Sequence, residues 1–158
     1  MGKFDGVLLA SDFDNTILNT EIPRRTGCPI PPISQRNVEA LHYFMNNGGR
    51  FAVATGRALP AFRMFADQVP MNAPAVVCNG AALYDFQAET YLETMELPEA
   101  VRVQGQAVLD RFPAAAVEAY HLDNVIHAVR PNALTRQHQH VTHAGVETAD
   151  SLLEVPMP

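Results

Sequence analysis

The stretch GVLLASDFDNT, residues 6–16, decides the expected fold. Its first five residues are continuously apolar, which is typical of a short strand buried on both faces. Two aspartates, Asp12 and Asp14, follow at once, with one residue between them. Because ligands of a parallel α/β sheet bind beyond the carboxyl ends of its strands, this pair of acids predicts a functional site.

Strand and helix patterns alternate along the residues that follow. A helix capped by Ser34 is expected to end at Gly48–Gly49, and a second helix is expected over residues 58–69. Short apolar runs predict strands over residues 50–56 and 74–80. The resulting βαβαβ order predicts an α/β fold with a Rossmann-like parallel sheet and right-handed crossovers.

The pattern then changes. A hairpin is expected over residues 81–94, then a helix that starts at Pro98, then a second hairpin around Asp123–Asn124. A meander with one helix differs from the first half of the chain, so it predicts the start of a smaller α+β domain. We expect one domain at residues 1–83 and the other at residues 84–158.

Charge and composition exclude several kinds of partner. The 158 residues carry 11 Lys and Arg against 17 Asp and Glu, a net charge of -6, and no basic stripe, so no nucleic acid is expected. The apolar run before Asp12 is too short for a signal segment, so we expect neither targeting nor a membrane. Cys28 and Cys78 lack the spacing of a disulfide framework or a zinc knuckle. These features together favour a cytoplasmic protein.

Three interpretations of the pair Asp12 and Asp14 compete. An Asx turn would close the strand without any function. Calcium is excluded, because an EF-hand loop beginning at Asp12 needs Gly and Glu where this chain has Ile17 and Pro23. The third interpretation is phosphoryl transfer, in which one carboxylate attacks phosphorus, its neighbour moves a proton, and the acids attract Mg²⁺. The position at a strand end favours the third interpretation.

Several motifs carry a resemblance to a known family. DFDNT (12–16) is similar to motif I, DxDxT, of the haloacid dehalogenase superfamily, and AVATGR (52–57) is similar to motif II. CNGA (78–81), followed by a hairpin, resembles the Cof-like, subclass IIB branch, which inserts a mobile cap between motifs II and III. The resemblance implies half of a superfamily core in the first domain and a partial cap in the second.

The resemblance implies a role for each matching residue. Asp12 would be the nucleophile and a Mg²⁺ ligand, and Asp14 would be the general acid and base, binding Mg²⁺ through its backbone carbonyl. Thr55 would bind the transferring phosphoryl group. For Arg57 the less favoured alternative is a surface residue at the start of the next helix, and Asn79 would equally suit a turn. The candidates for phosphate binding beside Thr55 are Thr16, Gly56, Arg57 and Asn79.

The implied reaction is Mg²⁺-dependent hydrolysis of a small phosphorylated metabolite, a sugar phosphate or nucleotide, through an aspartyl-phosphate. The family pattern also requires a later lysine (motif III) and later acids (motif IV), but the one lysine of this chain is Lys3. A strand rises roughly 3.3 Å per residue, so Lys3 is expected roughly 10 Å or more from the site. No acidic pair of the motif IV type follows the hairpin, where the aspartates Asp110, Asp123 and Asp150 are isolated.

We therefore expect the N-terminal portion of a longer protein, poorly active or inactive alone. Its sheet would have an unpaired edge, which favours self-association. A noncatalytic phosphate-binding module and a phosphomutase-like phosphotransferase remain alternatives.

The tail from residue 131 shows no clear element, but it holds three histidines. If the tail is extended, His138 and His140 share a strand face on which a metal would bind. No acid lies at a fixed spacing from these two or from His143, so a solvated surface cluster is favoured.

Overall fold

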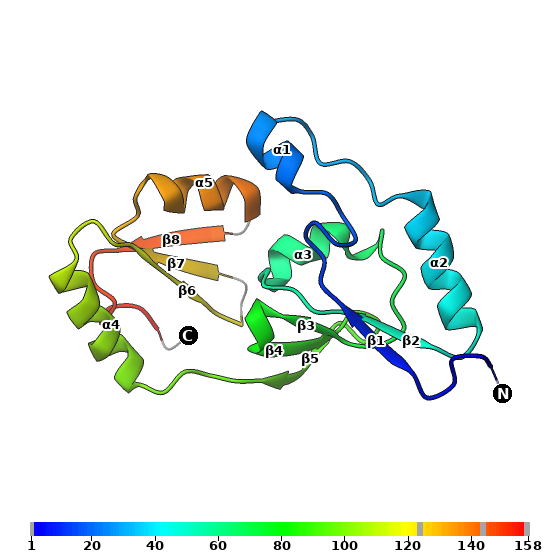
Figure 1. The fold of residues 1–158 in the computed structure, drawn as a ribbon. Coiled ribbons are helices and arrows are strands. Elements are labelled where there is room, and N and C mark those ends of the chain that lie inside the picture. The colour runs from blue at the N-terminus through cyan, green and yellow to red at the C-terminus, as the bar shows by residue number, and fades with distance from the viewer. Residues whose placement is uncertain (1, 123–124, 143–144, 157–158) are drawn as a thin grey trace. The chain divides into compact units, whose positions relative to one another are not determined.

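The computed structural model describes residues 2–122, 125–142 and 145–156 (Figure 1). Its contacts form two compact units. The chain passes from one unit to the other after Thr94, and the predicted domain boundary at residue 83 stays a prediction. The N-terminal unit comprises Met1–Arg57 and Phe62–Thr94, and the C-terminal unit comprises Ala58–Ala61 and Met95–Pro158.

The N-terminal unit contains a parallel strand pair that continues into an antiparallel hairpin. Its elements in chain order are β1 (Leu8–Ser11), α1 (Glu21–Thr26), α2 (Gln35–Asn46), β2 (Arg50–Val53), most of α3 (Leu59–Ala66), β3 (Ala75–Val77), the 3-10 turn η1 (Cys78–Gly80), β4 (Ala82–Asp85) and β5 (Thr90–Thr94). β1 and β2 are parallel, with Leu8 opposite Arg50, and a parallel bridge between Ala54 and Val76 links β2 to β3. β4 then pairs with β3 and with β5 in antiparallel. The predicted βαβαβ order and the predicted hairpin are confirmed.

Local sequence signals explain where the helices begin and end. The Ser34 hydroxyl accepts a hydrogen bond from the Asn37 amide at 3.2 Å and caps α2, as predicted. Gly48, with φ of 92°, follows α2 in a conformation that glycine adopts without strain. The sequence did not predict α1, a six-residue helix that ends at Gly27 with φ of 71°.

One side chain, that of Asn72, joins β2 to the segment before β3. Its Oδ1 accepts a hydrogen bond from the Phe51 amide at 2.7 Å, and its Nδ2 donates to the Gly49 carbonyl at 3.0 Å. The Asn72 and Ala73 amides both donate to the Phe51 carbonyl. Asn72 therefore supplies to β2 the kind of hydrogen bonds that a neighbouring strand would make.

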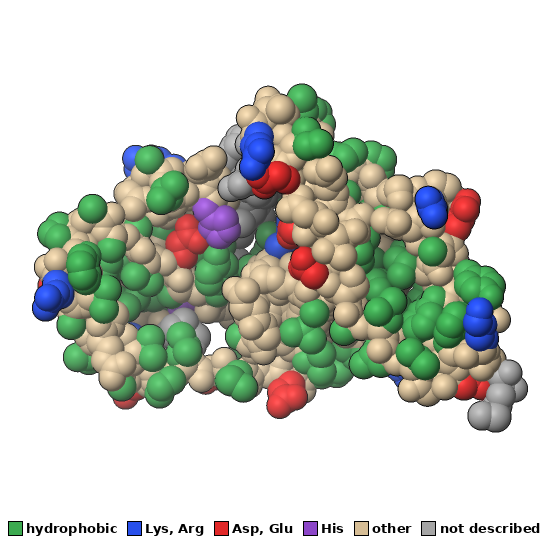
Figure 2. All heavy atoms as spheres, in the orientation of Figure 1, with side chains coloured by type: hydrophobic (Ala, Val, Ile, Leu, Met, Phe, Trp, Pro, Cys, Tyr) green, Lys and Arg blue, Asp and Glu red, His purple; other side chains and the backbone are tan. Residues whose placement is uncertain are grey.

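β1 and β2 differ in burial although both are apolar. Phe51 and Val53 of β2 are fully buried, whereas Leu8 is 62% exposed and Leu9 is 44% exposed. The prediction that the first strand is buried on both faces is therefore wrong. Within the described residues β1 has a neighbouring strand on one edge only, so nothing covers its other side. Figure 2 shows hydrophobic side chains gathered on the surface where Figure 1 draws β1.

The C-terminal unit is a mixed sheet with two helices. Its elements are α4 (Ala100–Arg111), β6 (Val117–Tyr120), β7 (Val125–Val129), α5 (Ala133–Thr142) and β8 (Gly145–Ala149). β6 and β7 form the predicted second hairpin, whose turn at 123–124 lies outside the described residues, and β8 pairs with β7 in parallel. The tail thus holds a helix and a strand that the sequence did not predict. None of the described helices is long and apolar enough to cross a membrane.

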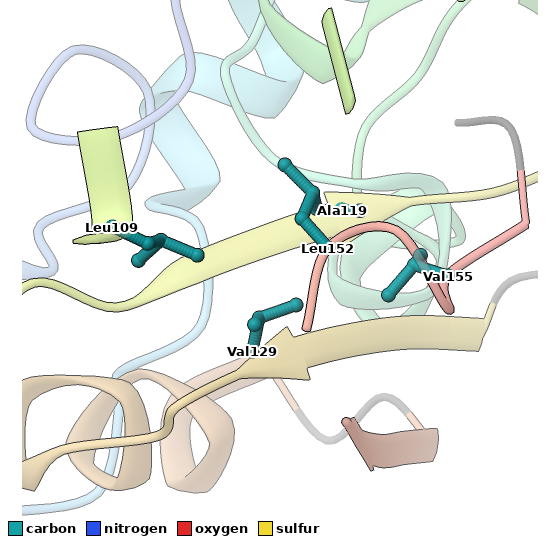
Figure 3. Close-up of a cluster of buried hydrophobic side chains, with 5 residues drawn as sticks. All are labelled: Leu109, Ala119, Val129, Leu152 and Val155. Atoms are coloured by element: carbon teal, nitrogen blue, oxygen red, sulfur yellow. The ribbon is translucent and has the colours of Figure 1, made fainter. Parts of the chain in front are cut away.

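The core of this unit is a cluster of buried aliphatic side chains (Figure 3). α4 contributes Leu109, and the sheet contributes Ala119 and Val129. Leu152 and Val155, which follow β8, complete the cluster. A Cβ on Gly105 of α4 would lie 2.5 Å from Leu152, so the glycine lets the segment after β8 approach the helix.

Candidate functional site

The loop after β1 holds the two acids on either side of a buried aromatic ring. Phe13 is fully buried and lies edge to face against Phe62, with ring centroids 5.1 Å apart, and near Phe65 at 5.6 Å. Asp12 is exposed, and Asp14 is half-buried. The aromatic anchor thus fixes the loop and leaves Asp12 accessible from solvent.

A tight turn positions the residues behind Phe13. The Phe13 carbonyl accepts hydrogen bonds from three successive amides, those of Thr16, Ile17 and Leu18. The Thr16 hydroxyl donates to Asp12 Oδ2 at 3.3 Å, so Thr16 contacts the carboxylate that the sequence singles out as the nucleophile. The structure therefore brings Asp12 and Thr16 together.

Asn15 is a residue of this loop whose role the sequence analysis missed. Its φ is 60°, a left-handed conformation that asparagine tolerates better than most residues. Its Oδ1 accepts hydrogen bonds from the Thr20 amide at 3.1 Å and the Glu21 amide at 2.8 Å, which begin α1. The Asp-Asn pair in DFDNT is a recognisable turn signal, and it would have indicated this role.

The loops after β2 and β3 are joined to each other. Thr55 is buried, and its hydroxyl accepts a hydrogen bond from the Arg57 amide at 3.1 Å. The Cys78 amide donates to the Arg57 carbonyl at 2.9 Å, and the Asn79 amide donates to the Thr55 carbonyl at 3.3 Å. A Cβ on Gly56 would lie 2.6 Å from Asn79 Oδ1, so a glycine suits this close approach. Thr55, Gly56, Arg57 and Asn79 therefore lie together.

Arg57 joins these two loops to the loop after β1. Its Nε donates to Asp14 Oδ2 and its Nη2 to Asp14 Oδ1, both at 2.8 Å, in a bidentate ion pair. The guanidinium also lies over two aromatic rings, 5.5 Å from the centroid of Phe13 and 4.9 Å from that of Phe65. Only 13% of the Arg57 side chain is exposed, so it is built into the unit rather than displayed on its surface. The interpretation of Arg57 as a surface residue is wrong.

The ion pair sets the charge state of Asp14. Partial burial alone would raise the pKa of this carboxyl, but the hydrogen bonds from Arg57 and Thr20 and the charge of Arg57 outweigh that effect. The pKa of Asp14 is therefore lowered from its ordinary value of 3.8. The ion pair therefore favours the carboxylate form of Asp14.

The donors near the acids suit a hard cation with few protein ligands. Within the described ranges no group of three or more His, Cys, Asp or Glu side chains is placed to hold a metal ion. The exposed Asp12 carboxylate and the backbone oxygen of Asp14 are both hard oxygen donors, and Mg²⁺ commonly keeps several waters and takes one or two protein carboxylates. Both are donor types that such an ion accepts.

Lys3 lies away from the acids, as the sequence predicts. Its ammonium lies over the rings of Phe4 and Tyr43, 5.2 Å and 5.9 Å from their centroids. Tyr43 belongs to the last turn of α2, near the start of β2, whereas Asp12 follows the end of β1. Lys3 therefore cannot pair with Asp12 of the same chain.

The histidines of the tail do not form the predicted strand face. His138 and His140 belong to helix α5 and not to a strand, so the hypothesis of a shared strand face is wrong. The Nδ1 of His138 lies 2.5 Å from Glu118 Oε2, and that oxygen also accepts a hydrogen bond from the Tyr120 hydroxyl. His143 lies outside the described residues.

Solved structures show the same fold as this chain. One is a haloacid dehalogenase-like hydrolase from Bacteroides thetaiotaomicron, with a TM-score of 0.69 and 19% identity over 99% of this chain and 56% of that one. Another is the subclass IIB sugar phosphatase BT4131, with a TM-score of 0.69 and 18% identity over 94% of this chain and 54% of that one. The chain thus spans about half the length of these structures.

Sequence comparison points to the same family. The pyridoxal phosphate phosphatase YbhA of Escherichia coli (strain K12) is 33% identical over 91 residues, which are 58% of this chain and 30% of that protein. The family model for haloacid dehalogenase-like hydrolases matches residues 9–152, nearly the whole chain. The chain therefore belongs to the haloacid dehalogenase-like hydrolases.

Proposed function

We propose that this chain carries the nucleophile half of a Mg²⁺-dependent phosphomonoesterase site that works through an aspartyl-phosphate on Asp12. One observation supports the proposal most. Hydrogen bonds join the loops that follow β1, β2 and β3. Arg57, in the loop after β2, bonds to both of the other loops. A phosphoryl group bound by Thr55 would then lie close to the acids of the first loop.

Asp12 and Asp14 divide the chemistry between them. An Asp12 oxygen forms a bond to phosphorus as the bond from phosphorus to the leaving oxygen breaks, and Asp14 gives that oxygen a proton. Water then attacks the phosphoaspartate while Asp14 takes the proton, which regenerates the Asp12 carboxylate and releases inorganic phosphate. The hydroxyl of Thr16, 3.3 Å from Asp12 Oδ2, limits the rotation of the attacking group.

Arg57 couples the charge state of Asp14 to the substrate. In the ion pair Asp14 is held as a carboxylate, the form that accepts a proton from water. The first step requires the protonated form instead. A phosphate dianion beside Thr55 offers the guanidinium a second acceptor, so substrate binding weakens the hold of Arg57 on Asp14 and favours its protonation.

Magnesium completes the charge balance of the proposed site. When bound, Mg²⁺ offsets the negative charges that two acids and a phosphate dianion bring together. The Asp12 carboxylate and the Asp14 backbone carbonyl would hold it. Chelation is therefore expected to remove phosphoryl binding, and added Mg²⁺ is expected to restore it, whereas the larger Ca²⁺ serves poorly.

A phosphate-binding module without turnover is the second candidate. It is favoured by the position of Lys3, which lies over Phe4 and Tyr43 and leaves the acids without an ammonium group among the described residues. Stabilising the transition state takes a positioned cation in addition to the metal. We therefore expect the 158 residues alone to bind a phosphoryl mimic but to turn over phosphate esters slowly or not at all.

The named relatives indicate only a broad class of substrate. One relative is named as a pyridoxal phosphate phosphatase and one structure as a sugar phosphatase. Both substrates are small phosphomonoesters. We propose that the protein acts on a metabolite of that class, and pyridoxal 5′-phosphate, a hexose phosphate and a nucleoside monophosphate form the panel that tests it.

The test is binding of beryllium fluoride, which mimics a phosphoryl group on a carboxylate, in the presence of Mg²⁺. The wild-type chain should bind it, and Asp12→Asn should lose binding because an amide cannot coordinate in place of the carboxylate. Asp67→Asn is the matched control, since Asp67 is exposed beyond the end of α3. Unchanged binding in Asp12→Asn would contradict the proposal.

Turnover separates the two candidates. Hydrolysis of an aryl phosphate is measured for the 158 residues and for a version extended through the reading frame beyond Pro158. Turnover only in the extended version supports the phosphatase with missing cationic groups. Equal rates would mean that the 158 residues supply every required group, and absence of turnover in both would favour the binding module.

A further inference from the structure

Thr20 precedes α1 directly, in the position from which a threonine hydroxyl ordinarily caps a helix. Its hydroxyl makes no such bond. The first amides of α1 find other acceptors. Asn15 Oδ1 accepts a hydrogen bond from the Glu21 amide at 2.8 Å. Asn19 Oδ1 accepts one from the Ile22 amide at 3.3 Å. The hydroxyl of Thr20 is therefore not part of the helix cap.

The Thr20 hydroxyl instead forms a hydrogen bond with the side chain of Asp14. Its contact with Asn15 Oδ1, at 3.5 Å, is longer than an ordinary hydroxyl bond of about 2.7–2.8 Å. A local turn brings residue 20 back to residue 14. The Asn15 amide donates to the Leu18 carbonyl at 2.6 Å, and Asp14 and Leu18 form a parallel bridge. Leu18 is buried, so the turn is anchored in the core.

Thr20 and Arg57 hold the side chain of Asp14 in different ways. The guanidinium donates to both oxygens of Asp14 at 2.8 Å, and it can only donate, so it suits the carboxylate better than the protonated acid. A hydroxyl both donates and accepts. The hydroxyl of Thr20 can therefore keep its bond to the carboxyl when one of the two oxygens carries a proton.

We infer that Thr20 is a positioning residue for Asp14, and that its hydroxyl holds the carboxyl in one orientation while the carboxyl gives up and takes up a proton. The inference rests on the proposed function, in which Asp14 moves the proton and Arg57 turns toward the phosphate. When Arg57 turns, the Thr20 hydroxyl remains bonded to Asp14 and keeps its proton directed at the leaving oxygen. The helix α1 thereby contributes to the reaction, because it fixes the place of Thr20.

Kinetics of the version extended beyond Pro158 test this role. Loss of the hydroxyl matters most when the leaving oxygen needs a proton, so Thr20→Val should lower kcat/KM about tenfold for phenyl phosphate and less than about threefold for nitrophenyl phosphate. Thr20→Ser keeps the hydroxyl and should restore both values. Thr26→Val is the matched control, because the Thr26 hydroxyl donates to the Ile22 carbonyl within the same helix, and it should change neither value. Equal losses on the two substrates in Thr20→Val would overturn the inference.

The contact itself is tested in the 158-residue chain by the NMR resonance of the Asp14 side-chain carboxyl carbon at neutral pH, assigned by its loss in Asp14→Asn. Thr20→Val should shift this resonance, and so should Thr20→Ala, which serves if valine prevents folding. Thr20→Ser and Thr26→Val should leave it near its wild-type position. A resonance that loss of the hydroxyl leaves unchanged would overturn the inference, whether or not the chain hydrolyses phosphate esters. A shifted resonance in a protein whose extended version has no turnover would contradict the proposed function and leave Thr20 a structural contact alone.

Discussion

β1 and β2 lie side by side, are both mostly apolar, and are covered to very different extents. Phe51 and Val53 are fully buried, because β2 has β1 on one edge and the bridge to β3 on the other. Leu8 and Leu9 are exposed, because β1 has one neighbour among the described residues. An apolar run therefore indicates that a strand is suited to burial, but it does not indicate which segment buries it.

The difference continues into the loops at the ends of the two strands. Thr55, after β2, is buried and is held by hydrogen bonds through its amide, carbonyl and hydroxyl. Asp12, after β1, is exposed, and its carboxylate accepts a hydrogen bond from Thr16. The β2 side thus forms a fixed frame, and the β1 side presents the group that would react.

The largest expected effect tests the burial difference directly. Phe51→Ala should lower the free energy of unfolding by about 3–5 kcal/mol, because it leaves a cavity in the core. Leu8→Ala should lower it by less than about 1 kcal/mol, since most of that side chain already contacts solvent. Urea denaturation at low protein concentration, where association contributes least, gives both values. Equal losses would show that β1 is covered in solution.

A smaller effect is expected at the ion pair that joins the two loops. Arg57→Ala should lower the free energy of unfolding by about 1–3 kcal/mol, because it leaves the half-buried Asp14 carboxylate without its bidentate partner. Arg57→Lys keeps the charge but loses the two-pronged hydrogen bonding of the guanidinium. Its free energy of unfolding should therefore lie between those of wild type and Arg57→Ala. A double-mutant cycle with Asp14→Asn isolates the pair, and additive losses would mean that the two residues do not interact in solution.

The same pair predicts a dependence on pH. The pKa of Asp14 is lower in the folded chain than its ordinary value of 3.8. The stability from this shift is therefore fully present above that value and is lost as pH falls through the folded pKa. Arg57→Ala should make the acid limb of the stability curve less steep, and an unchanged limb would contradict this origin of the shift.

The next effect concerns Asn15, whose side chain joins the loop after β1 to the start of α1. Asn15→Ala should cost about 1–2 kcal/mol, because it removes the side-chain acceptor at the start of α1 and places alanine at a φ of 60°. Asn15→Asp keeps the acceptor and should cost less. Thermal unfolding of the two variants compares them. Equal costs would mean that the side-chain acceptor does not stabilise the start of α1.

The smallest effect on stability is expected at a second, exposed ion pair, that of Asp110 with Arg130. Hydrogen bonds from Arg130 and Gln106 lower the pKa of Asp110, but this group is exposed. Any stability from it is present above its ordinary pKa and is lost as pH falls. Asp110→Asn should change unfolding at neutral pH far less than Asp14→Asn, and added salt should erase the difference from wild type.

Much of the fold was predictable because it depends on local patterns. The alternation of strands and helices up to β3, the β4–β5 hairpin and the Ser34 cap follow from apolar spacing and turn residues. α1 was missed because it lies beside a segment rich in proline. β8 was missed because GVETA is short and has one large apolar side chain, that of Val146, and its place depends on pairing with β7.

The sequence predicted which strand ends carry the candidate site, but it did not predict the contacts among their residues. The residues after three strands were expected to meet, and those loops are joined. The pairing of Arg57 with Asp14 was not expected, because 43 residues separate them and the packing of Phe13 and Phe65 positions the guanidinium. The roles proposed for these residues stay predictions.

Asn72 has a consequence for how this chain tolerates change in length. Its side chain forms hydrogen bonds with the backbone on both sides of Arg50, so an insertion between α3 and β3 that displaced it would leave the Phe51 amide without its acceptor. The mostly exposed residues 28–32, between α1 and α2, carry no such tie among the described hydrogen bonds after Cys28. We therefore expect insertions and deletions among homologues to be common in the connection between α1 and α2 and rare in the connection between α3 and β3.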